Sequence, residues 1–316
     1  MTQFDLTPME PVPWAKPFDA PDWLYQVKWD GVRMLAVRNE AGSRLINRKG
    51  NERTGQYPEL ASLAAGLPLG SVVDGEVVVL QNGRPSFHAV LQRDLARRPA
   101  VIRAKKRQFP ATYCVFDLLY HRGEDIRGLP LAERQRLLED VLPQGQPQLQ
   151  LVESFASGKQ LFAAVEREGL EGIVAKQRTS KYRPGKGSDD WRKIKSFREA
   201  NCVVGGYTKR QGQLSALLLG LWAEDGQLIY VGAAGSGLSQ ADWQGLGQFL
   251  AAASIDVPPF SSPPQARNRQ VHWLQPVLAV RVRFMEWTPE LKLRAPVVVR
   301  FQAAADVDCS IAGQGV

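Results

Sequence analysis

Charged residues interrupt the short apolar runs of this chain. Asp74 and Glu76 stand in the middle of "SVVDGEVVVL", Lys28 follows "YQV", and Glu171 and Lys176 bound "GIVA". Runs rich in Val, Ile and aromatic residues are typical of buried β-strands when Gly, Asn or Pro flank them. A buried charge is costly unless it is paired or neutralised. The pattern therefore predicts strands whose lysines and carboxylates line one shared cleft.

Strands and helices are interleaved in the part of the chain before Ser196. Besides the runs above, further strands are predicted at 33–38, 43–47, 111–120 and 172–177. Apolar residues at helical spacing predict helices at 58–67, 87–98, 131–142 and 158–169. Because strands and helices do not alternate strictly, the sequence predicts a mixed, largely antiparallel α+β domain.

After Ser196 the pattern becomes mostly strand. Strands are predicted at 202–208, 215–223, 228–235 and 278–287, and one helix at 240–253, with Gly-rich turns between the strands. About five strands and one helix in a segment of this length suit a small β-barrel of the OB type. The sequence therefore predicts one domain at 1–196 and an OB-fold domain at 197–316.

The composition limits the environment and the partners of the chain. Lys and Arg outnumber Asp and Glu by 40 to 32, and the excess lies mostly before Ser196. Such an excess fits a polyanionic partner, nucleic acid first, or a solvated basic face. Cys114, Cys202 and Cys309 are too few and too far apart for a disulfide framework or a zinc site. Without a membrane-length apolar run or a signal-peptide pattern, a cytoplasmic protein is predicted.

Six short motifs follow one another in a recognisable order. "KWDGVR" (28–33) resembles the KxDGxR signature of the covalent nucleotidyltransferases, which are the DNA ligases, RNA ligases and mRNA capping enzymes. The other motifs are "LINRKG" (45–50), "DGE" (74–76), "YCVFD" (113–117), "EGIVAK" (171–176) and "WRKIK" (191–195). Together with "FHAVLQRD" and "EWTP", they resemble the bacterial ATP-dependent DNA ligases, especially the ligase module of the nonhomologous end-joining enzyme. The resemblance implies an adenylation domain followed by an OB-fold domain.

The resemblance also implies a role for each motif residue. Lys28 would attack the α-phosphorus of ATP and form a lysyl-AMP intermediate, because an amine nucleophile can be activated by neighbouring cations. The predicted nucleotide-binding residues are Gln26 for the adenine amino group, Phe116 for stacking on adenine, Glu76 for the ribose hydroxyls, Arg33 and Arg48 for the ribose side or the 5′-phosphate of a nick, and Lys193 and Lys195 for the α-phosphate.

A divalent cation and a DNA substrate complete the predicted reaction. Glu171 would hold Mg²⁺ or Mn²⁺, which prefer carboxylate oxygens, with Asp30 reaching the cation through water. The predicted substrate is nicked or broken double-stranded DNA, and the protein is expected to be a monomer that works with repair or end-joining proteins. Taken singly, Phe116 could be a core residue, and Lys193 and Lys195 a solvated face.

Two positions depart from the family pattern. Relatives usually carry Glu where this chain has Gln26, and an Arg-x-Asp-Lys-like motif where it has Gln302, Ala304 and Ala305. We therefore hypothesise that self-adenylylation is slow while sealing of pre-adenylated nicks persists. The alternative functions are an RNA ligase or capping enzyme, which "FHAVLQRD" and "EWTP" disfavour, and a nucleic-acid-binding protein without catalysis, which the intact motifs oppose. NAD-dependent ligases are disfavoured because the chain lacks the cysteine cluster of their zinc module.

Overall fold

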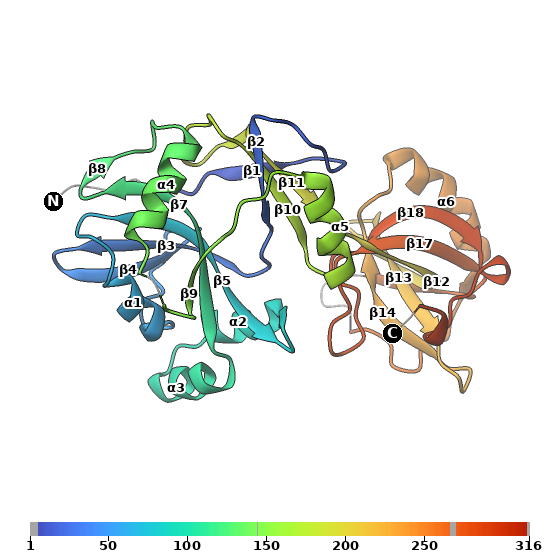
Figure 1. Cartoon of the computed structure of the whole chain (residues 1–316). Coiled ribbons are helices and arrows are strands. Elements are labelled where there is room, and N and C mark those ends of the chain that lie inside the picture. Colours follow the sequence, from blue (N-terminus) through green and yellow to red (C-terminus); the bar gives the residue numbers. More distant parts are fainter. Residues whose placement is uncertain (1–5, 144, 266–269, 315–316) are drawn as a thin grey trace. The chain divides into compact units, whose positions relative to one another are not determined.

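The structure is a computed structural model that describes residues 6–143, 145–265 and 270–314. The chain divides into two compact units, Met1–Ser196 and Phe197–Val316 (Figure 1). Within the described residues, no helix is long and apolar enough to cross a membrane.

The first unit contains two sheets. The smaller sheet has the order β1-β11-β10-β2, with β1 (Glu10–Pro13) parallel to β11 (Gly187–Lys195), and β10 (Gly172–Gln177) antiparallel to both β11 and β2 (Trp23–Val27). The larger sheet has the order β4-β3-β5-β7-β8, with β6 and β9 at its margins. Its strands are β3 (Val32–Asn39), β4 (Gly42–Asn47), β5 (Val72–Gln81), β6 (Arg84–Pro85), β7 (Ala111–His121), β8 (Glu124–Asp125) and β9 (Leu149–Leu151). The predicted α+β class with largely antiparallel sheets is confirmed.

Among the described residues of this unit, five helices accompany the sheets: α1 (Pro58–Ala64), α2 (Phe87–Asp94), α3 (Pro99–Gln108), α4 (Leu131–Val141) and α5 (Gly158–Glu168). Four of them were predicted, because each presents an apolar stripe to the core. The sequence analysis missed α3, which has no buried residue and therefore no apolar stripe to detect. Ser86 and Ser157 cap the N-termini of α2 and α5, and Gly169 ends α5 in the left-handed conformation that glycine adopts readily.

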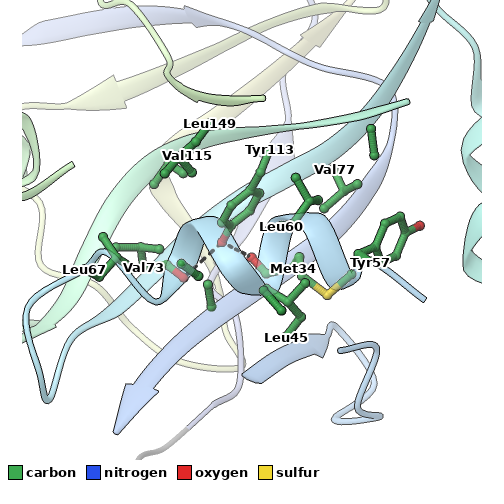
Figure 2. Packing of buried hydrophobic residues seen from close by; sticks show 14 of the residues in the cluster. Met34, Leu45, Tyr57, Leu60, Leu67, Val73, Val77, Tyr113, Val115 and Leu149 are labelled. Atoms are coloured by element: carbon green, nitrogen blue, oxygen red, sulfur yellow. Dashed lines mark hydrogen bonds between the residues drawn. The ribbon is translucent and has the colours of Figure 1, made fainter. Parts of the chain in front are cut away.

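The larger sheet is buried on both faces. On one face, side chains such as Val73, Val77 and Val115 pack against Leu60 of α1 (Figure 2). Within this cluster, the hydroxyl of Tyr113 donates to the Met34 carbonyl at 2.8 Å, and the Val73 carbonyl lies 3.2 Å away. On the other face, Leu35, Cys114 and Phe116 join residues of the smaller sheet, including Leu24 and Trp191. The cleft described below opens from this second core.

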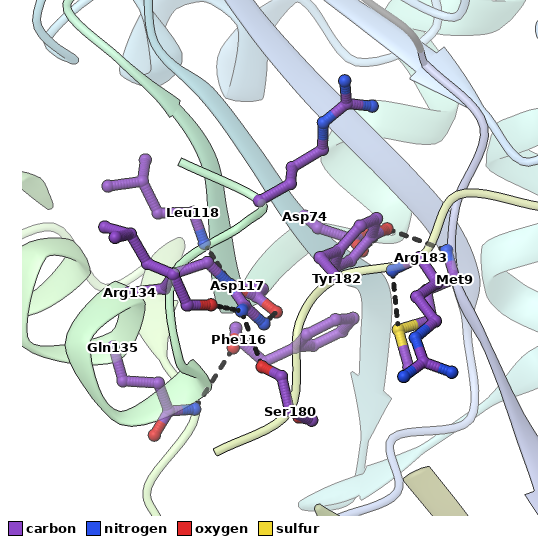
Figure 3. A network of polar contacts seen from close by, with 12 residues as sticks. Met9, Asp74, Phe116, Asp117, Leu118, Arg134, Gln135, Ser180, Tyr182 and Arg183 are labelled. Atoms are coloured by element: carbon purple, nitrogen blue, oxygen red, sulfur yellow. Dashed lines mark hydrogen bonds and ion pairs between the residues drawn. The ribbon is translucent and has the colours of Figure 1, made fainter. Parts of the chain in front are cut away.

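A buried ion pair joins α4 to the centre of β7. The guanidinium of Arg134 donates to both carboxylate oxygens of Asp117 at 2.8 Å, and neither side chain is exposed (Figure 3). The Arg134 Nη1 also donates to the carbonyls of Leu129 and Ser180. The charge of each partner is thus compensated and its hydrogen-bonding groups are used, as burial of an ion pair requires.

The second unit is a sheet of antiparallel strands with one helix. Its elements are β12 (Arg198–Arg210), β13 (Gln213–Trp222), β14 (Leu228–Ala234), α6 (Gln240–Ala252), β15 (Ser254–Ile255), β16 (Gln270–Leu274), β17 (Leu278–Phe284) and β18 (Val297–Ala303). The long strand β12 pairs with β17 through its first half and with β16 through its second half. A bridge between Ser236 and Val297 connects the two ends of the sheet, as closure into a barrel requires. The predicted OB-type barrel is confirmed.

We expect Asp117→Asn to destabilise the first unit by about 3–5 kcal/mol, because Arg134 would remain buried without a carboxylate. Urea unfolding at pH 7 measures this loss. The matched control is Glu52→Gln, which breaks the exposed pair between Arg44 and Glu52, with side chains 50% and 47% exposed. That change should cost no more than about 1 kcal/mol. Equal losses in the two variants would contradict the assigned role of the buried pair.

Candidate active site

Strand register brings the motif residues of the smaller sheet into rows. The Lys28 amide donates to the Gly172 carbonyl at 2.9 Å, and Gly172 is paired with Lys195. In the next row, Val174 lies between Gln26 and Lys193. Because every second side chain of a strand points to the same face, these rows lie on one face of the sheet. Lys28 itself follows β2 directly, so it stands at the end of the strand and not within it.

A cleft of about 590 Å³ opens over these rows. Its lining comes only from the first unit and includes all the predicted site residues except Glu171, namely Gln26, Lys28, Asp30, Arg33, Arg48, Glu76, Phe116, Lys193 and Lys195. The volume lies in the range of pockets that hold nucleotide-sized ligands. The structure therefore collects motifs that are far apart in the sequence into one site.

Glu171 forms ion pairs with two lysines that line the cleft. Its Oε2 contacts the Nζ of Lys28, and its Oε1 lies 3.1 Å from the Nζ of Lys195. The Glu171 side chain is only 6% exposed, whereas that of Lys28 is 22% exposed. The carboxylate is thus fixed by burial, while the amine of Lys28 keeps access to the cleft.

Arg33 forms a bidentate ion pair with the buried Asp74. Its Nε and Nη2 donate to the two oxygens of Asp74 at 2.6 and 2.7 Å, and the Tyr182 hydroxyl donates to the same carboxylate at 2.6 Å. Burial alone would lower the pKa of Arg33, but the charge and hydrogen bonds of Asp74, together with the charges of Tyr182 and Glu76, raise it above its usual value. Because this bidentate pairing occupies the guanidinium fork, we assign Arg33 to holding the floor of the cleft, not to binding a phosphate.

Glu76 lies opposite Arg33 in the pairing of β5 with β3. Burial raises the pKa of Glu76 to about 8, although the nearby charges of Arg33 and Lys28 act in the opposite direction. A carboxyl group with this pKa changes its protonation near neutral pH. It is placed to exchange hydrogen bonds with a polar ligand in the cleft.

A β-bulge positions Phe116. Asp74 of β5 pairs with Asp117 of β7 and Gly75 pairs with Val115, so Phe116 is the extra residue between them. Bulges next to active sites commonly change the direction of a side chain. The ring of Phe116 has the Arg33 guanidinium carbon 4.4 Å and the Lys176 Nζ 4.2 Å from its centroid.

Arg48 and Lys193 lie on the outer side of the cleft. The Arg48 side chain is 65% exposed and its Nε lies 2.7 Å from Glu10 Oε1, a pairing that contributes little in water. Partial burial lowers the pKa of Lys193, Glu10 opposes this effect, and the charges of Lys28 and Lys195 add to it. Both side chains therefore present positive charge where an anionic ligand would enter.

The sequence analysis assigned no role to two lining residues, Lys176 and Trp191. Both are buried at the inner end of the cleft, and they are paired in the register of β10 and β11. The available signal was the two-residue spacing, because Lys176 follows Val174 by two and must share its face.

A mixed α+β unit with a lysine-lined cleft, followed by an OB-type barrel, is the architecture expected for the covalent nucleotidyltransferase class. Residues 13–195 match the ATP dependent DNA ligase domain, and residues 210–304 match the ATP dependent DNA ligase C terminal region. The chain belongs to the ATP-dependent DNA ligase family.

Several relatives are similar over most of the chain. The multifunctional non-homologous end joining DNA repair protein LigD of Mycobacterium tuberculosis is 35% identical over 283 residues, which are 87% of this chain and 35% of LigD. DNA ligase C of the same organism is 34% identical over 68% of this chain and 63% of its own length. The chain thus spans about a third of LigD. The solved structure of a mycobacterial DNA ligase D complexed with ATP and MES is 32% identical to this chain, with a TM-score of 0.55. The similarity covers 95% of this chain and 96% of that structure.

The raised pKa of Glu76 predicts a specific dependence of stability on pH. Between its unfolded pKa, about 4.3, and its folded pKa, about 8, the folded state binds more protons than the unfolded state. The wild-type free energy of unfolding should therefore fall as pH rises from 5.5 to 8. Glu76→Gln should remove roughly 3 kcal/mol of this fall, measured by urea unfolding at both pH values.

The control for this experiment is Glu52→Gln. The hydroxyl of Thr54 donates to Glu52 and lowers its pKa, so it stays ionised throughout this pH interval. Its removal should leave the pH dependence unchanged. If the wild type and Glu76→Gln lost stability in parallel, the raised pKa would be wrong.

Proposed function

We propose that the chain seals 5′-phosphate/3′-OH nicks or breaks in DNA through a lysyl-AMP intermediate, using ATP. The observation that carries this proposal is the position of Lys28, whose amine contacts Glu171 and opens into the cleft beside Lys195. A lysine held in this way, with further cations beside it, is suited to nucleophilic catalysis on phosphorus.

In the first step, the Lys28 Nζ would attack the α-phosphorus of ATP. A nitrogen–phosphorus bond forms, the bond from the α-phosphorus to the bridging oxygen breaks, and pyrophosphate leaves. The nucleophile must first lose a proton, and the neighbouring cations Lys193 and Lys195 favour the neutral amine. Lys193 and Lys195 supply positive charge for the negative charge of the reacting phosphate.

The remaining lining residues would bind the nucleoside. In this proposal Phe116 stacks on adenine, Gln26 contacts the adenine amino group and Glu76 binds the ribose hydroxyls. Arg48 lies at the exposed rim, so it is the arginine that we assign to the 5′-phosphate of a nick. Arg33 acts through Asp74 and fixes the floor on which Phe116 lies.

The donors near Lys28 fit one divalent cation, Mg²⁺ or Mn²⁺. Among the described residues, no three His, Cys, Asp or Glu side chains cluster as a protein-only metal site would require. Mg²⁺ needs only one or two carboxylates when phosphates and water supply its other ligands. Glu171 would be that carboxylate, with Asp30 of the cleft lining as a water-mediated partner. When bound, the cation would neutralise charge on the phosphates of ATP.

Transfer of AMP to the DNA 5′-phosphate and its displacement by the 3′-OH would complete the reaction. We propose that the Met1–Ser196 unit is the adenylation domain and that the OB-type unit helps bind the duplex. We also propose that the protein is a cytoplasmic monomer that works with repair or end-joining proteins. Phosphate contacts by the basic first unit would make DNA binding salt-dependent. A nicked duplex with DNA or RNA strands at the nick separates a DNA ligase from an RNA ligase.

We expect Lys28→Ala to abolish covalent labelling by α-labelled ATP, because the attacking amine is removed. The assay is incubation with Mg²⁺ or Mn²⁺ followed by a denaturing gel. Lys181→Ala, at an exposed position outside the cleft lining, is the matched control and should label like the wild type. Retention of the label by Lys28→Ala would exclude Lys28 as the nucleophile.

The departure at the C-terminal motif favours one alternative, a nucleic-acid-binding protein with impaired self-adenylylation. Gln302 stands on β18, where its amide donates to Asn201 at 3.0 Å, and Ala304 and Ala305 carry no charge toward pyrophosphate. We expect adenylylation by ATP to be roughly 10²-fold slower than sealing of a pre-adenylated nick, the scale for loss of one electrostatic contact. The single-turnover rates of self-adenylylation and of nick sealing measure this difference. Equal rates would contradict this expectation, and failure to seal would support the alternative.

A further inference from the structure

The helix α3 and the residues before it carry positive charge that no acidic residue compensates. Between Asp94 and Asp117 the chain has no Asp or Glu. The basic residues in this interval are Arg97, Arg98, Arg103, Lys105, Lys106 and Arg107. All of them except Lys105 are exposed, and within the described residues these five form no ion pair and no side-chain hydrogen bond. Figure 1 shows α3 projecting at the margin of the first unit. This surface therefore presents charge that a polyanion would neutralise.

Several of these charges act against the helix that carries them. Arg98 is the N-cap residue of α3, makes no side-chain capping bond and follows Arg97, so two positive charges stand at the positive end of the helix dipole. Arg103 and Arg107 are four positions apart, which places like charges side by side on the helix surface. Only the cations of the last turn suit the dipole. Because α3 has no buried residue, packing in the core does not offset the repulsion. The charges therefore cost stability and indicate a function outside the fold.

This basic segment begins beside the cleft. Asp94 and Leu95, at the end of α2, line the cleft, and Arg97 follows Leu95 by two positions. The Nζ of Lys105 donates to the side-chain oxygen of Gln92, which holds α3 against α2. The position of α3 is thus fixed relative to the cleft. A duplex whose nick lies in the cleft would therefore pass close to α3.

Three of the exposed cations share one face of α3. Arg103, Lys106 and Arg107 are separated by three and four positions, which is the spacing of neighbours on a helix surface. We propose that these three residues bind backbone phosphates of the DNA duplex beside the nick. This inference deepens the proposed function and rests on it. The 10 residues of α3 span about 15 Å, a length over which duplex DNA carries about nine negative charges.

A nucleic-acid backbone fits this surface better than a membrane does. Every exposed cation of the segment except Lys106 is an arginine, whose planar guanidinium pairs with phosphate oxygens through two hydrogen bonds. A helix that lies on a membrane needs a continuous apolar face, and among the large apolar side chains of α3 only Val101 is exposed, at 37%. Phosphate contacts carry no sequence information, so binding by α3 should not depend on the bases of the duplex.

The salt dependence of DNA binding measures the number of phosphate contacts. The probe is a nicked duplex with a 3′-dideoxy end at the nick, without ATP or divalent cations, and fluorescence anisotropy gives its Kd over a series of salt concentrations. In the triple variant with Arg103→Gln, Lys106→Gln and Arg107→Gln, the Kd should rise by at least about 10-fold in 0.1 M salt. The slope of the logarithm of the association constant against that of the salt concentration should become shallower by about 2–3. Arg103→Gln alone should change this slope by about 1.

The matched control removes three exposed positive charges from α4 and α5. It is the triple variant with Arg136→Gln, Lys159→Gln and Arg167→Gln, in which Lys159 and Arg167 each have a carboxylate within 4.0 Å, from Asp19 and Glu168. The control should keep the wild-type Kd and slope. The α3 triple variant should unfold at the wild-type urea concentration, because its substitutions remove no core contact. Weaker DNA binding would then not result from misfolding.

The outcomes separate this inference from the proposed function. An α3 triple variant that keeps the wild-type Kd and slope overturns the role of α3 and leaves the proposed ATP-dependent sealing intact. Equal changes of slope in the α3 variant and the control also overturn it, because net charge would then govern binding. Wild-type protein that does not bind the nicked duplex overturns the proposed function and this inference together.

Discussion

Two aspartates at the centre of the larger sheet determine how the cleft is built. Asp74 and Asp117 are paired across β5 and β7, and both are buried. Asp74 forms an ion pair with Arg33, and Asp117 forms one with Arg134. Breaking such a pair leaves an uncompensated buried charge, so the sheet, α4 and the Tyr182 segment are held in one arrangement. The floor of the cleft is therefore rigid and nearly neutral. Positive charge remains at the rim, where phosphates would be bound.

Much of this architecture could be predicted from the sequence, because local rules govern it. Runs rich in Val, Ile and aromatic residues identified the strand around Asp74 and Glu76, and apolar stripes identified four helices of the first unit. The ordered motifs also identified the residues that the cleft collects. The helix α3 was missed because it contributes no residue to a core, and Lys28 was placed within a strand that ends at Val27.

The contacts within the site could not be predicted, since they depend on which partner a side chain finds. Arg33 was predicted to bind the ribose side or the 5′-phosphate of a nick, and its pairing with Asp74, 41 positions away in sequence, could not be foreseen. The orientation of the Gln26 amide depends on Val152 and Ser154, more than 100 positions away. The bulge at Phe116 changes the face of one residue and has no signature in the strand pattern. Long-range pairing of this kind is decided only when the strands are in register.

The buried cations of the first unit differ in how their charge is compensated. Arg93 and Arg134 are completely buried, yet each guanidinium has a carboxylate and backbone carbonyls as partners. Within the described parts of the chain, Lys176 is the buried lysine, and it has neither. A sequence selected only for stability would replace it, since an apolar residue of similar length removes the desolvation cost. This cost falls on the lining of the cleft, beside Gln26, whereas the arginines that support the fold are compensated.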